Sequence, residues 1–460
     1  MADREGPRRR RASLDRDWTK GSIVGNLWGL AWPMTISHLV MLFGPTVDMI
    51  WVGRLGAASI AGVGVAGMAV QLINAARMGL NTGTRALLAR AVGAQDLEEA
   101  NHVIQQALVV SALFSVIMAV IGILLSEQIL RLVGVEADVV SEGAAYMRIQ
   151  FAGAVFMSFG MMATGAMQAS GDAVTAMQIN IVTRIFHTAL APFLIFGWWI
   201  FPRLGVSGVA LTSVVTQAVG TGVGLWVLFG GRTRIQPTLH NFRFDGNMIW
   251  RIVKIGIPSS ITTLERSLAS FVLTWLLAPF GTVAVAAHSL IQRVDQFIHM
   301  PATGVGQASG VLAAQNLGAG EPKRAEKTGW IAAAIFSGVM FIGAIIIWFW
   351  AEYAIRIFNS DPELVKISAT FLRIEIVNYI VFGLVMVLSN CLNGVGDTIV
   401  TMLTTLVTMW GVQVPMAYFL PKITNLGVYG VRWGIVSAIV MRAIIYTVYF
   451  KMGRWKRIRV

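Results

Sequence analysis

The stretch that decides the fold occurs twice, as LLARAVGAQDLEEA at 87–100 and as LAAQNLGAGEPKRA at 312–325. Each copy has a Gly-Ala hinge followed by a short charged run, a pattern typical of a helix end, a tight turn and a new helix. The offset between the copies, from Leu87 to Leu312, also relates other pairs: Pro33 and Pro258, Gly56 and Gly281, Gly79 and Gly304, Arg148 and Arg373, and Gly171-Asp172 and Gly396-Asp397. One offset held over so long a stretch indicates an internal duplication.

The composition indicates a membrane protein. Hydrophobic residues make up 56% of the chain and charged residues 13%, whereas a soluble domain carries roughly 25% charged residues. A single cysteine, Cys391, allows no disulfide within the chain, and no zinc-binding pattern is present. The net charge of +13 could suggest a nucleic-acid partner, but the basic residues cluster at segment ends and form no basic face. We therefore expect neither a nucleic-acid partner nor a metal site.

The apolar runs match the roughly 20 residues that a helix needs to cross a bilayer. Six runs lie in the first half, near 27–52, 57–82, 103–126, 144–168, 174–200 and 206–230. Six more lie in the second half, near 252–278, 283–312, 329–351, 367–392, 398–420 and 428–450. Isolated strands cannot satisfy their backbone in lipid. The sequence therefore predicts an all-α polytopic membrane protein with twelve transmembrane helices.

Lysine and arginine in the short loops predict the orientation. Basic residues gather in the N-terminal tail, which contains RRRR at 8–11, in the linker between the halves, in the turn at 320–327 and at the C-terminus. The loops that would lie opposite are neutral to acidic. We expect a multi-pass protein of the plasma (inner) membrane with both termini cytoplasmic, and no signal peptide.

Six spans per half is an even number, so the second repeat enters the membrane from the same side as the first. The repeats are therefore predicted to be parallel, with the substrate path between them. The predicted organisation is a basic tail at 1–20, a six-helix lobe at 21–231, a cytoplasmic linker at 232–248 and a second six-helix lobe at 249–460.

Two stretches carry a resemblance to a known family. PTVDMIWVGRLGAASIAGVG at 45–64 and VAVAAHSLIQRVDQFIHMPATGVGQASGVLAAQNLGAGEPKRA at 283–325, together with the Gly-Asp turns, resemble the multidrug and toxic compound extrusion (MATE) family. The resemblance covers the chain after its tail. It implies two six-helix lobes arranged as a V and export of drug-like molecules against entry of protons or sodium ions.

Charged residues inside the spans are costly and by default mark a function or a partner. In the first half these are Asp48 in the first span and a face of the fifth span formed by Asn180, Arg184 and His187. The resemblance implies that Asp48 is a cation or proton site. His187 and Ala191 stand where one branch of the family has an Asn and an Asp, so the match to that branch is incomplete. We expect Asp48 to be the main coupling residue and to carry a proton, with this face of the fifth span as its partner, because the two lie at nearly the same depth in the membrane. The alternative is a permanent Asp48–Arg184 ion pair that only holds the two helices together.

The second half offers another candidate site. Its members are Glu265 in the seventh span, His288, Gln292 and Asp295 on one face of the eighth, and Glu375 and Asn378 in the tenth. We expect Glu265 and Asp295 to approach each other, and the alternative is that Glu265 or Asp295 pairs with Arg293. A second branch of the family uses a seventh-helix Glu and a tenth-helix Asp. Here Glu265 lies one residue off that register, and Phe382 occupies the Asp position.

These observations predict a cation-coupled antiporter, not an enzyme, that exports amphipathic, cationic small molecules by alternating access. Protons are preferred to sodium ions, because Ala191 removes an oxygen ligand and Arg184 supplies a competing fixed cation. No Walker motif is present, so ATP is not expected, and neither is any other cofactor. We expect a monomer embedded in the lipid bilayer.

Other functions stay open at this stage. A flippase for a lipid-linked precursor, from the same superfamily, would add helices and line its cavity with arginines. A membrane-embedded prenyl-lipid enzyme would need paired acidic motifs such as DDxxD, which the chain lacks. A channel is disfavoured by the duplicated lobes.

Overall fold

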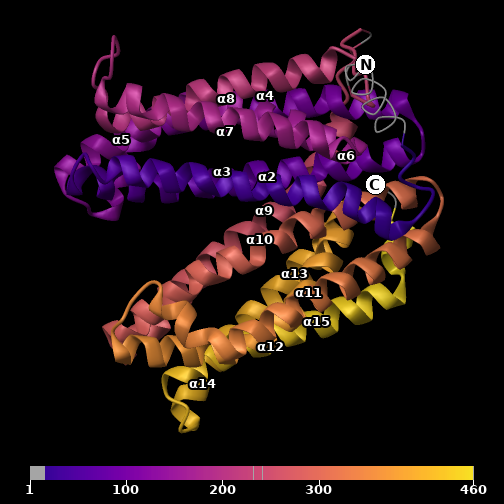
Figure 1. Ribbon diagram of the computed structural model, residues 1–460. Coiled ribbons are helices and arrows are strands. Elements are labelled where there is room, and N and C mark those ends of the chain that lie inside the picture. Colours follow the sequence, from indigo (N-terminus) through magenta and orange to yellow (C-terminus); the bar gives the residue numbers. More distant parts are fainter. Residues whose placement is uncertain (1–15, 232, 241, 459–460) are drawn as a thin grey trace, which may run out of the picture. The chain divides into compact units, whose positions relative to one another are not determined.

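The structure is a computed structural model that describes residues 16–231, 233–240 and 242–458 (Figure 1). The predicted basic run at 8–11 and Arg232 in the predicted linker lie outside the described residues. Within the described part of the chain the regular elements are helices, as the apolar runs predict.

The first half of the chain forms six helical rods. They are α2 (Ile23–Val52), α3 (Ala57–Gly93), α4 (Leu97–Val133), the pair α5 (Ala137–Ala152) and α6 (Ala154–Ser170), α7 (Ala173–Phe196) and α8 (Gly205–Phe229). Helices α5 and α6 meet at Gly153 with a bend of 49° and together form one rod. Each rod contains one of the predicted apolar runs.

The second half repeats this order. Its rods are α9 (Gly246–Leu277), α10 (Thr282–Gly318), α11 (Pro322–Arg356), α12 (Pro362–Gly394), α13 (Thr398–Thr408) continued through the π-helical turn η3 (Met409–Gln413) into α14 (Val414–Ile423), and α15 (Val428–Met452). Short 3₁₀ turns lie at η2 (Ala278–Phe280) and η4 (Arg454–Arg457).

Nine of the described helices are long and apolar enough to cross a membrane, and the bent pair α5–α6 makes a tenth. Helices α9 and α10 are long enough at 32 and 37 residues, but both carry charged side chains within their length. They include Glu265 and Arg266 on α9 and Arg293 and Asp295 on α10. Charged side chains such as these lower the mean hydropathy of a helix.

The repeated phrase forms the turns between α3 and α4 and between α10 and α11, as predicted. Gln95 has φ = 59° in the first turn, and its counterpart in the second turn is Gly320 with φ = 74°. This left-handed backbone favours glycine. Asp96 then caps α4 by accepting a hydrogen bond of 2.9 Å from the Glu99 amide.

The chain divides into two compact units whose boundaries fall inside α2 and α9. Unit 1 contains Ile36–Ser260 and the described residues before Thr19, whereas unit 2 contains Thr19–Thr35 and the chain from Ile261. Within unit 1, helix α3 packs against α4, α5 and α6, and helix α7 packs against α8.

Within unit 2, helix α12 packs against α10, α11 and α15. A Cβ atom on Gly394 would overlap the Gly310 carbonyl, so α10 and α12 pack backbone to backbone.

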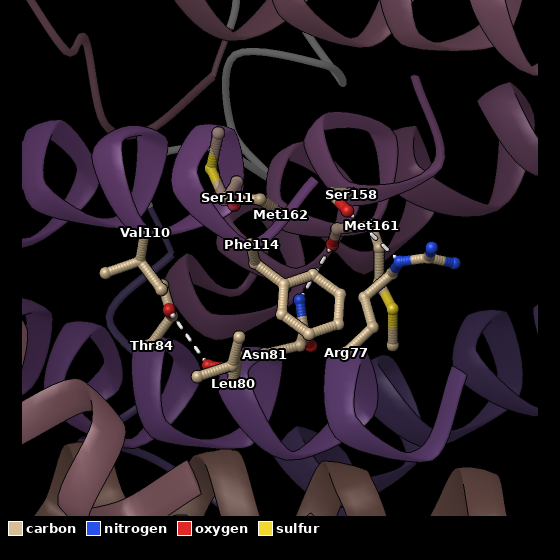
Figure 2. A pocket seen from close by; sticks show the side chains of 10 residues that line it. All are labelled: Arg77, Leu80, Asn81, Thr84, Val110, Ser111, Phe114, Ser158, Met161 and Met162. Carbon is tan, nitrogen blue, oxygen red and sulfur yellow. Dashed lines mark hydrogen bonds between the residues drawn. The ribbon is translucent and has the colours of Figure 1, made fainter. Parts of the chain in front are cut away.

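A small cavity lies inside unit 1 between α3, α4 and α6 (Figure 2). Its volume is ≈ 20 Å³, enough for about one water-sized particle. Its polar lining residues are Arg77, Asn81, Thr84, Ser111 and Ser158.

The segment at the predicted linker is fixed to α4 by side-chain hydrogen bonds. Gln105 and Gln106 donate to the carbonyls of Thr238 and Arg243, both at 2.7 Å, and His102 lies 3.1 Å from the Asp245 carboxylate. The hydrogen bond with His102 and those from backbone amides of α9 lower the pKa of Asp245. The stability that this carboxylate contributes is therefore present at neutral pH and is lost only as the pH falls through its lowered pKa.

Candidate functional site

The structure brings together two of the predicted residues of unit 1. His187 on α7 lies with its Nε2 atom 2.8 Å from Oδ1 of Asp48 on α2. The side chains are 3% and 15% exposed, respectively. Asp48 is therefore hydrogen-bonded to His187, whereas no ion pair with Arg184 is found between these described side chains.

A residue that the sequence reasoning missed, Thr216 on α8, holds the other ring nitrogen of His187. Its Oγ1 atom lies 3.2 Å from His187 Nδ1 and donates to the carbonyl of Thr212 at 2.8 Å. A hydroxyl has one proton to donate, so Thr216 accepts from His187 and Nδ1 carries a hydrogen. The short contact between His187 Nε2 and Asp48 then needs one further proton, shared by the imidazole and the carboxylate.

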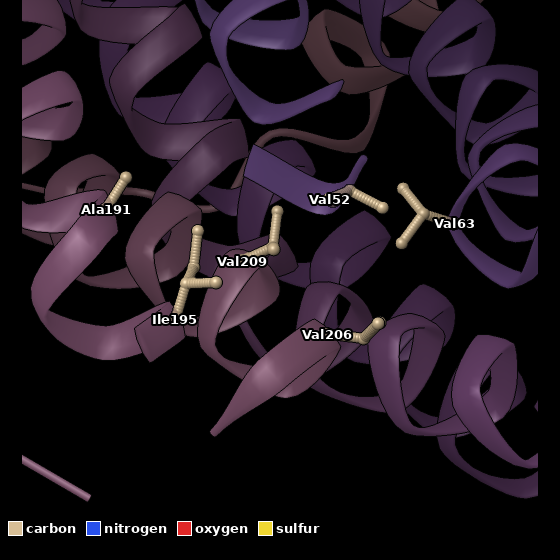
Figure 3. Packing of buried hydrophobic residues seen from close by; sticks show 6 residues of the cluster. All are labelled: Val52, Val63, Ala191, Ile195, Val206 and Val209. Atoms are coloured by element: carbon tan, nitrogen blue, oxygen red, sulfur yellow. The ribbon is translucent and has the colours of Figure 1, made fainter. Parts of the chain in front are cut away.

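An apolar cluster includes residues one helical turn away from each member of this pair, and Figure 3 shows the cluster. Its buried members are Val52, Val63, Ala191, Ile195, Val206 and Val209. Val52 follows Asp48 by one helical turn, and Ala191 follows His187 by one turn. The position where one branch of the family has an Asp is thus a fully buried alanine in an apolar cluster, which supplies no oxygen ligand.

The other two predicted residues of this site do not join the Asp48–His187 pair. The guanidinium of Arg184 lies against Gly44, one turn before Asp48, where a Cβ atom on Gly44 would overlap it. Arg184 is still close enough to interact electrostatically with Asp48. Asn180 is partly buried on α7, two turns before His187, and no hydrogen bond joins these two described side chains.

In unit 2 the structure joins four predicted residues around Arg432 of α15, which the sequence reasoning missed. Arg432 binds Glu375 at 3.0 Å with both side chains 1% exposed, and its Nη2 lies 2.8 Å from Nδ1 of His288. Asn378 donates to Glu375 at 2.6 Å, and Gln292 lies 3.2 Å from the other nitrogen of His288. Because arginine only donates, His288 Nδ1 accepts, and this ring is neutral.

Asp295 lies in a different set of contacts. It accepts a hydrogen bond of 2.6 Å from Tyr379 on α12, instead of pairing with Arg293. Tyr379 also makes a T-shaped contact with the His299 ring, and His299 stacks on Phe382 at a centroid distance of 3.7 Å. Phe382, at the position where a second branch of the family has an Asp, therefore forms an aromatic contact.

Glu265 on α9 is 3% exposed, and neither of its carboxylate oxygens has a hydrogen-bond partner among the described residues. Arg442 on α15 is close enough to interact with it electrostatically, yet its Nε donates to Thr408 at 3.0 Å. No hydrogen bond joins the described side chains of Glu265 and Asp295, and their predicted approach stays a prediction.

The signal for Arg432 is present in the sequence, because it is a charged residue inside the last apolar run. Thr216 and Tyr379 give no comparable signal, since threonine and tyrosine are ordinary in transmembrane helices. No group of three or more His, Cys, Asp or Glu side chains in the described chain could hold a metal ion.

A duplicated, all-helical, multi-pass membrane protein with buried titratable side chains in each unit belongs to the class of secondary transporters. The MatE family model matches residues 33–193 and 258–419. The two matches begin at Pro33 and Pro258, a pair that the repeat offset relates. The chain belongs to the MATE family of multidrug efflux transporters.

Known relatives resemble the chain over nearly all of its length. The probable multidrug resistance protein YoeA of Bacillus subtilis is 28% identical over 92% of both chains. The multidrug resistance protein NorM of Burkholderia vietnamiensis is 27% identical over 90% of this chain and 91% of its own.

Solved structures show the same fold. One, the outward-facing conformation of a multidrug resistance MATE family transporter, has a TM-score of 0.88 and 25% identity over 96% of this chain and 98% of its own. Another, a MOP superfamily transporter from Pyrococcus furiosus for which a reversed polarity of the binding pocket is described, has a TM-score of 0.87 and 25% identity over 95% and 96%. The predicted family, the two six-helix repeats and the assignment as a transporter, not an enzyme, are confirmed.

Proposed function

We propose that this protein is a proton-coupled antiporter that exports amphipathic, cationic drug-like molecules by alternating access. The observation that carries the proposal is the Asp48–His187 contact of 2.8 Å, in which Thr216 fixes the ring tautomer and leaves one proton to be shared. The guanidinium of Arg184 lies against Gly44, one helical turn before Asp48, and places a fixed positive charge near the pair. The protein acts as a monomer in the plasma (inner) membrane, and it uses neither ATP nor a cofactor.

The donor set at Asp48 favours a proton over a sodium ion. A hard cation needs several oxygen ligands, whereas Asp48 has an imidazole beside it. The Thr216 hydroxyl already accepts from that ring, and Ala191 offers no side-chain oxygen. In a one-for-one exchange the charges of the entering proton and of the departing monovalent cation cancel, so the pH difference drives export, with about 1.4 kcal/mol for each tenfold difference in proton concentration.

The direct test is export of a cationic dye from proteoliposomes in which proton and sodium gradients are imposed separately. We expect the pH gradient alone to drive export, and the sodium gradient alone to give the rate of protein-free liposomes. Export that needs sodium at constant pH would overturn the proposed coupling ion.

Replacing Thr216 with Val should shift the pH dependence of export toward acid by up to about one pH unit. The valine leaves the Nδ1 hydrogen of His187 without its acceptor, and this disfavours the doubly protonated ring by the worth of one hydrogen bond. Dye export measured against pH at a fixed pH difference checks this.

The matched control for this change is Thr212→Val on the same helix. Among the described residues the Thr212 hydroxyl donates to the Gly208 carbonyl, at 2.7 Å, and not to His187, so its loss should leave the pH profile unchanged. Equal profiles for the two variants would show that Thr216 does not orient His187.

The proposed orientation places the linker in the cytoplasm and the turn before α5 outside the cell. Single cysteines at Arg234 and Glu136 should therefore react with an impermeant thiol reagent from opposite sides of the membrane. The native Cys391 is fully buried, so the background is low. Labelling of both positions from the same side would contradict the topology.

A flippase for a lipid-linked precursor is the second candidate, and two arginines favour it. Arg266 on α9 and Arg293 on α10 are charged side chains inside spanning helices that keep some solvent exposure, where they could contact an anionic head group. Transfer of a fluorescent lipid diphosphate between leaflets, without dye export, would favour this candidate over the antiporter.

A further inference from the structure

A buried arginine inside unit 1 takes no part in the contacts of Asp48. Arg77 on α3 is 7% exposed and lies near the middle of a helix that runs from Ala57 to Gly93. Its Nε donates to Ser158 at 3.1 Å, and its Nη1 contacts Asn74 at 2.5 Å and the sulfur of Met157 at 3.7 Å. All three partners are uncharged.

A cation in this position is costly unless an opposite charge lies beside it. Among the described residues no aspartate or glutamate forms an ion pair with Arg77 or lines the adjoining cavity. The buried Arg432 of unit 2, by contrast, has the Glu375 carboxylate as its counter-charge. Arg77 therefore needs a counter-charge from another source.

The cavity beside Arg77 is lined by groups that can donate hydrogen bonds (Figure 2). Ser158 accepts from Arg77 Nε and keeps its own hydroxyl hydrogen for another acceptor. Asn81 uses one amide hydrogen for the Met161 carbonyl at 2.8 Å and keeps the second. Ser111 on α4 supplies a third donor, whereas Thr84 is already bonded to the Leu80 carbonyl.

We propose that this cavity is an anion-binding site in which a chloride-sized monovalent anion neutralises Arg77. The volume of ≈ 20 Å³ admits one particle of about the size of a water molecule, which suits a single small anion. Arg77 supplies the charge, and Ser111, Ser158 and Asn81 supply hydrogen-bond donors from three helices. The bound anion therefore stabilises the packing of α3, α4 and α6.

The test is thermal unfolding of the purified full chain in nanodiscs, with sodium gluconate replaced by sodium chloride at constant ionic strength. A specific site gives a saturable rise of the unfolding midpoint with chloride concentration, because the ligand binds only the folded state. Arg77→Gln should abolish this dependence. Arg131→Gln, an exposed arginine on α4, should keep it.

Ser111→Ala removes one donor without touching Arg77 and should raise the half-effect concentration of chloride roughly fivefold, the worth of about one hydrogen bond. This variant decides the matter if Arg77→Gln does not fold. Bromide in place of chloride should give an anomalous scattering peak between Ser111 and Ser158. An equal midpoint in chloride and gluconate, or a dependence unchanged by both variants, would overturn the proposal. Because the readout is stability, it is independent of the proposed coupling at Asp48.

Discussion

Replacing Asp48 with Asn is expected to abolish pH-driven export and leave the protein folded. The amide is nearly the same size as the carboxylate and can donate to Nε2 of His187, now 2.8 Å from Asp48 Oδ1. It cannot take up or release a proton between the two faces of the membrane. Dye export under a pH gradient should therefore fall to the rate of protein-free liposomes, while the unfolding midpoint changes little.

The control for Asp48→Asn is Asp138→Asn, which removes an exposed acid at the start of α5. It should export at the wild-type rate. Full export by Asp48→Asn with a requirement for sodium would reject the proton-carrying role of Asp48. Normal pH-driven export by a folded Asp48→Asn would show that the Asp48–His187 contact only joins α2 to α7.

Replacing Arg432 with Leu is expected to destabilise unit 2 by about 3–5 kcal/mol. Glu375 is only 1% exposed, so the change leaves a buried carboxylate without its counter-charge. It also removes the group that donates a hydrogen bond to Nδ1 of His288. The free energy of unfolding can be measured by denaturant titration of the purified protein.

A second change tests the cause of this loss. Adding Glu375→Gln to Arg432→Leu removes the unpaired charge, so the double variant should recover a large part of the stability. Arg373→Leu is the matched control, because Arg373 pairs with Glu352 at 3.3 Å while both side chains are partly exposed, and its loss should cost under about 1 kcal/mol. Equal costs for Arg432→Leu and Arg373→Leu would contradict the account.

The sequence predicts the rods more accurately than their bends. Each predicted apolar run lies in a helical rod, because a spanning segment must satisfy its own backbone and so depends on local sequence. The break at Gly153 between α5 and α6 and the π-helical turn at Met409–Gln413 were not predicted. Both lie within apolar runs, whose composition does not indicate where a helix bends.

The sequence also predicts which residues belong to the candidate sites more accurately than the contacts that they make. A charge inside an apolar run identifies Asp48, Glu265 and Glu375 as residues with a function or a partner. For Asp48 the matching depth of the fifth span also predicts the face that it meets, but not which side chain of that face it bonds. The partners of two of these acids come from distant helices: His187 is 139 residues from Asp48, and Arg432 is 57 residues from Glu375. Thr216, which decides the His187 tautomer, could not be distinguished from other threonines in the spans.

The sequence by itself determined the duplication, the twelve spans and the family, because a repeat offset and a hydrophobic length are properties of the chain read in order. Only the tertiary structure decided that Asp48 bonds His187, not Arg184, that Asp295 bonds Tyr379, and that Arg77 lies beside a cavity lined by donors. These choices depend on the rotation of each helix about its axis and on which neighbour its polar face meets. Packing sets both, since small residues such as Gly44 and Gly394 determine how closely side chains and helices approach.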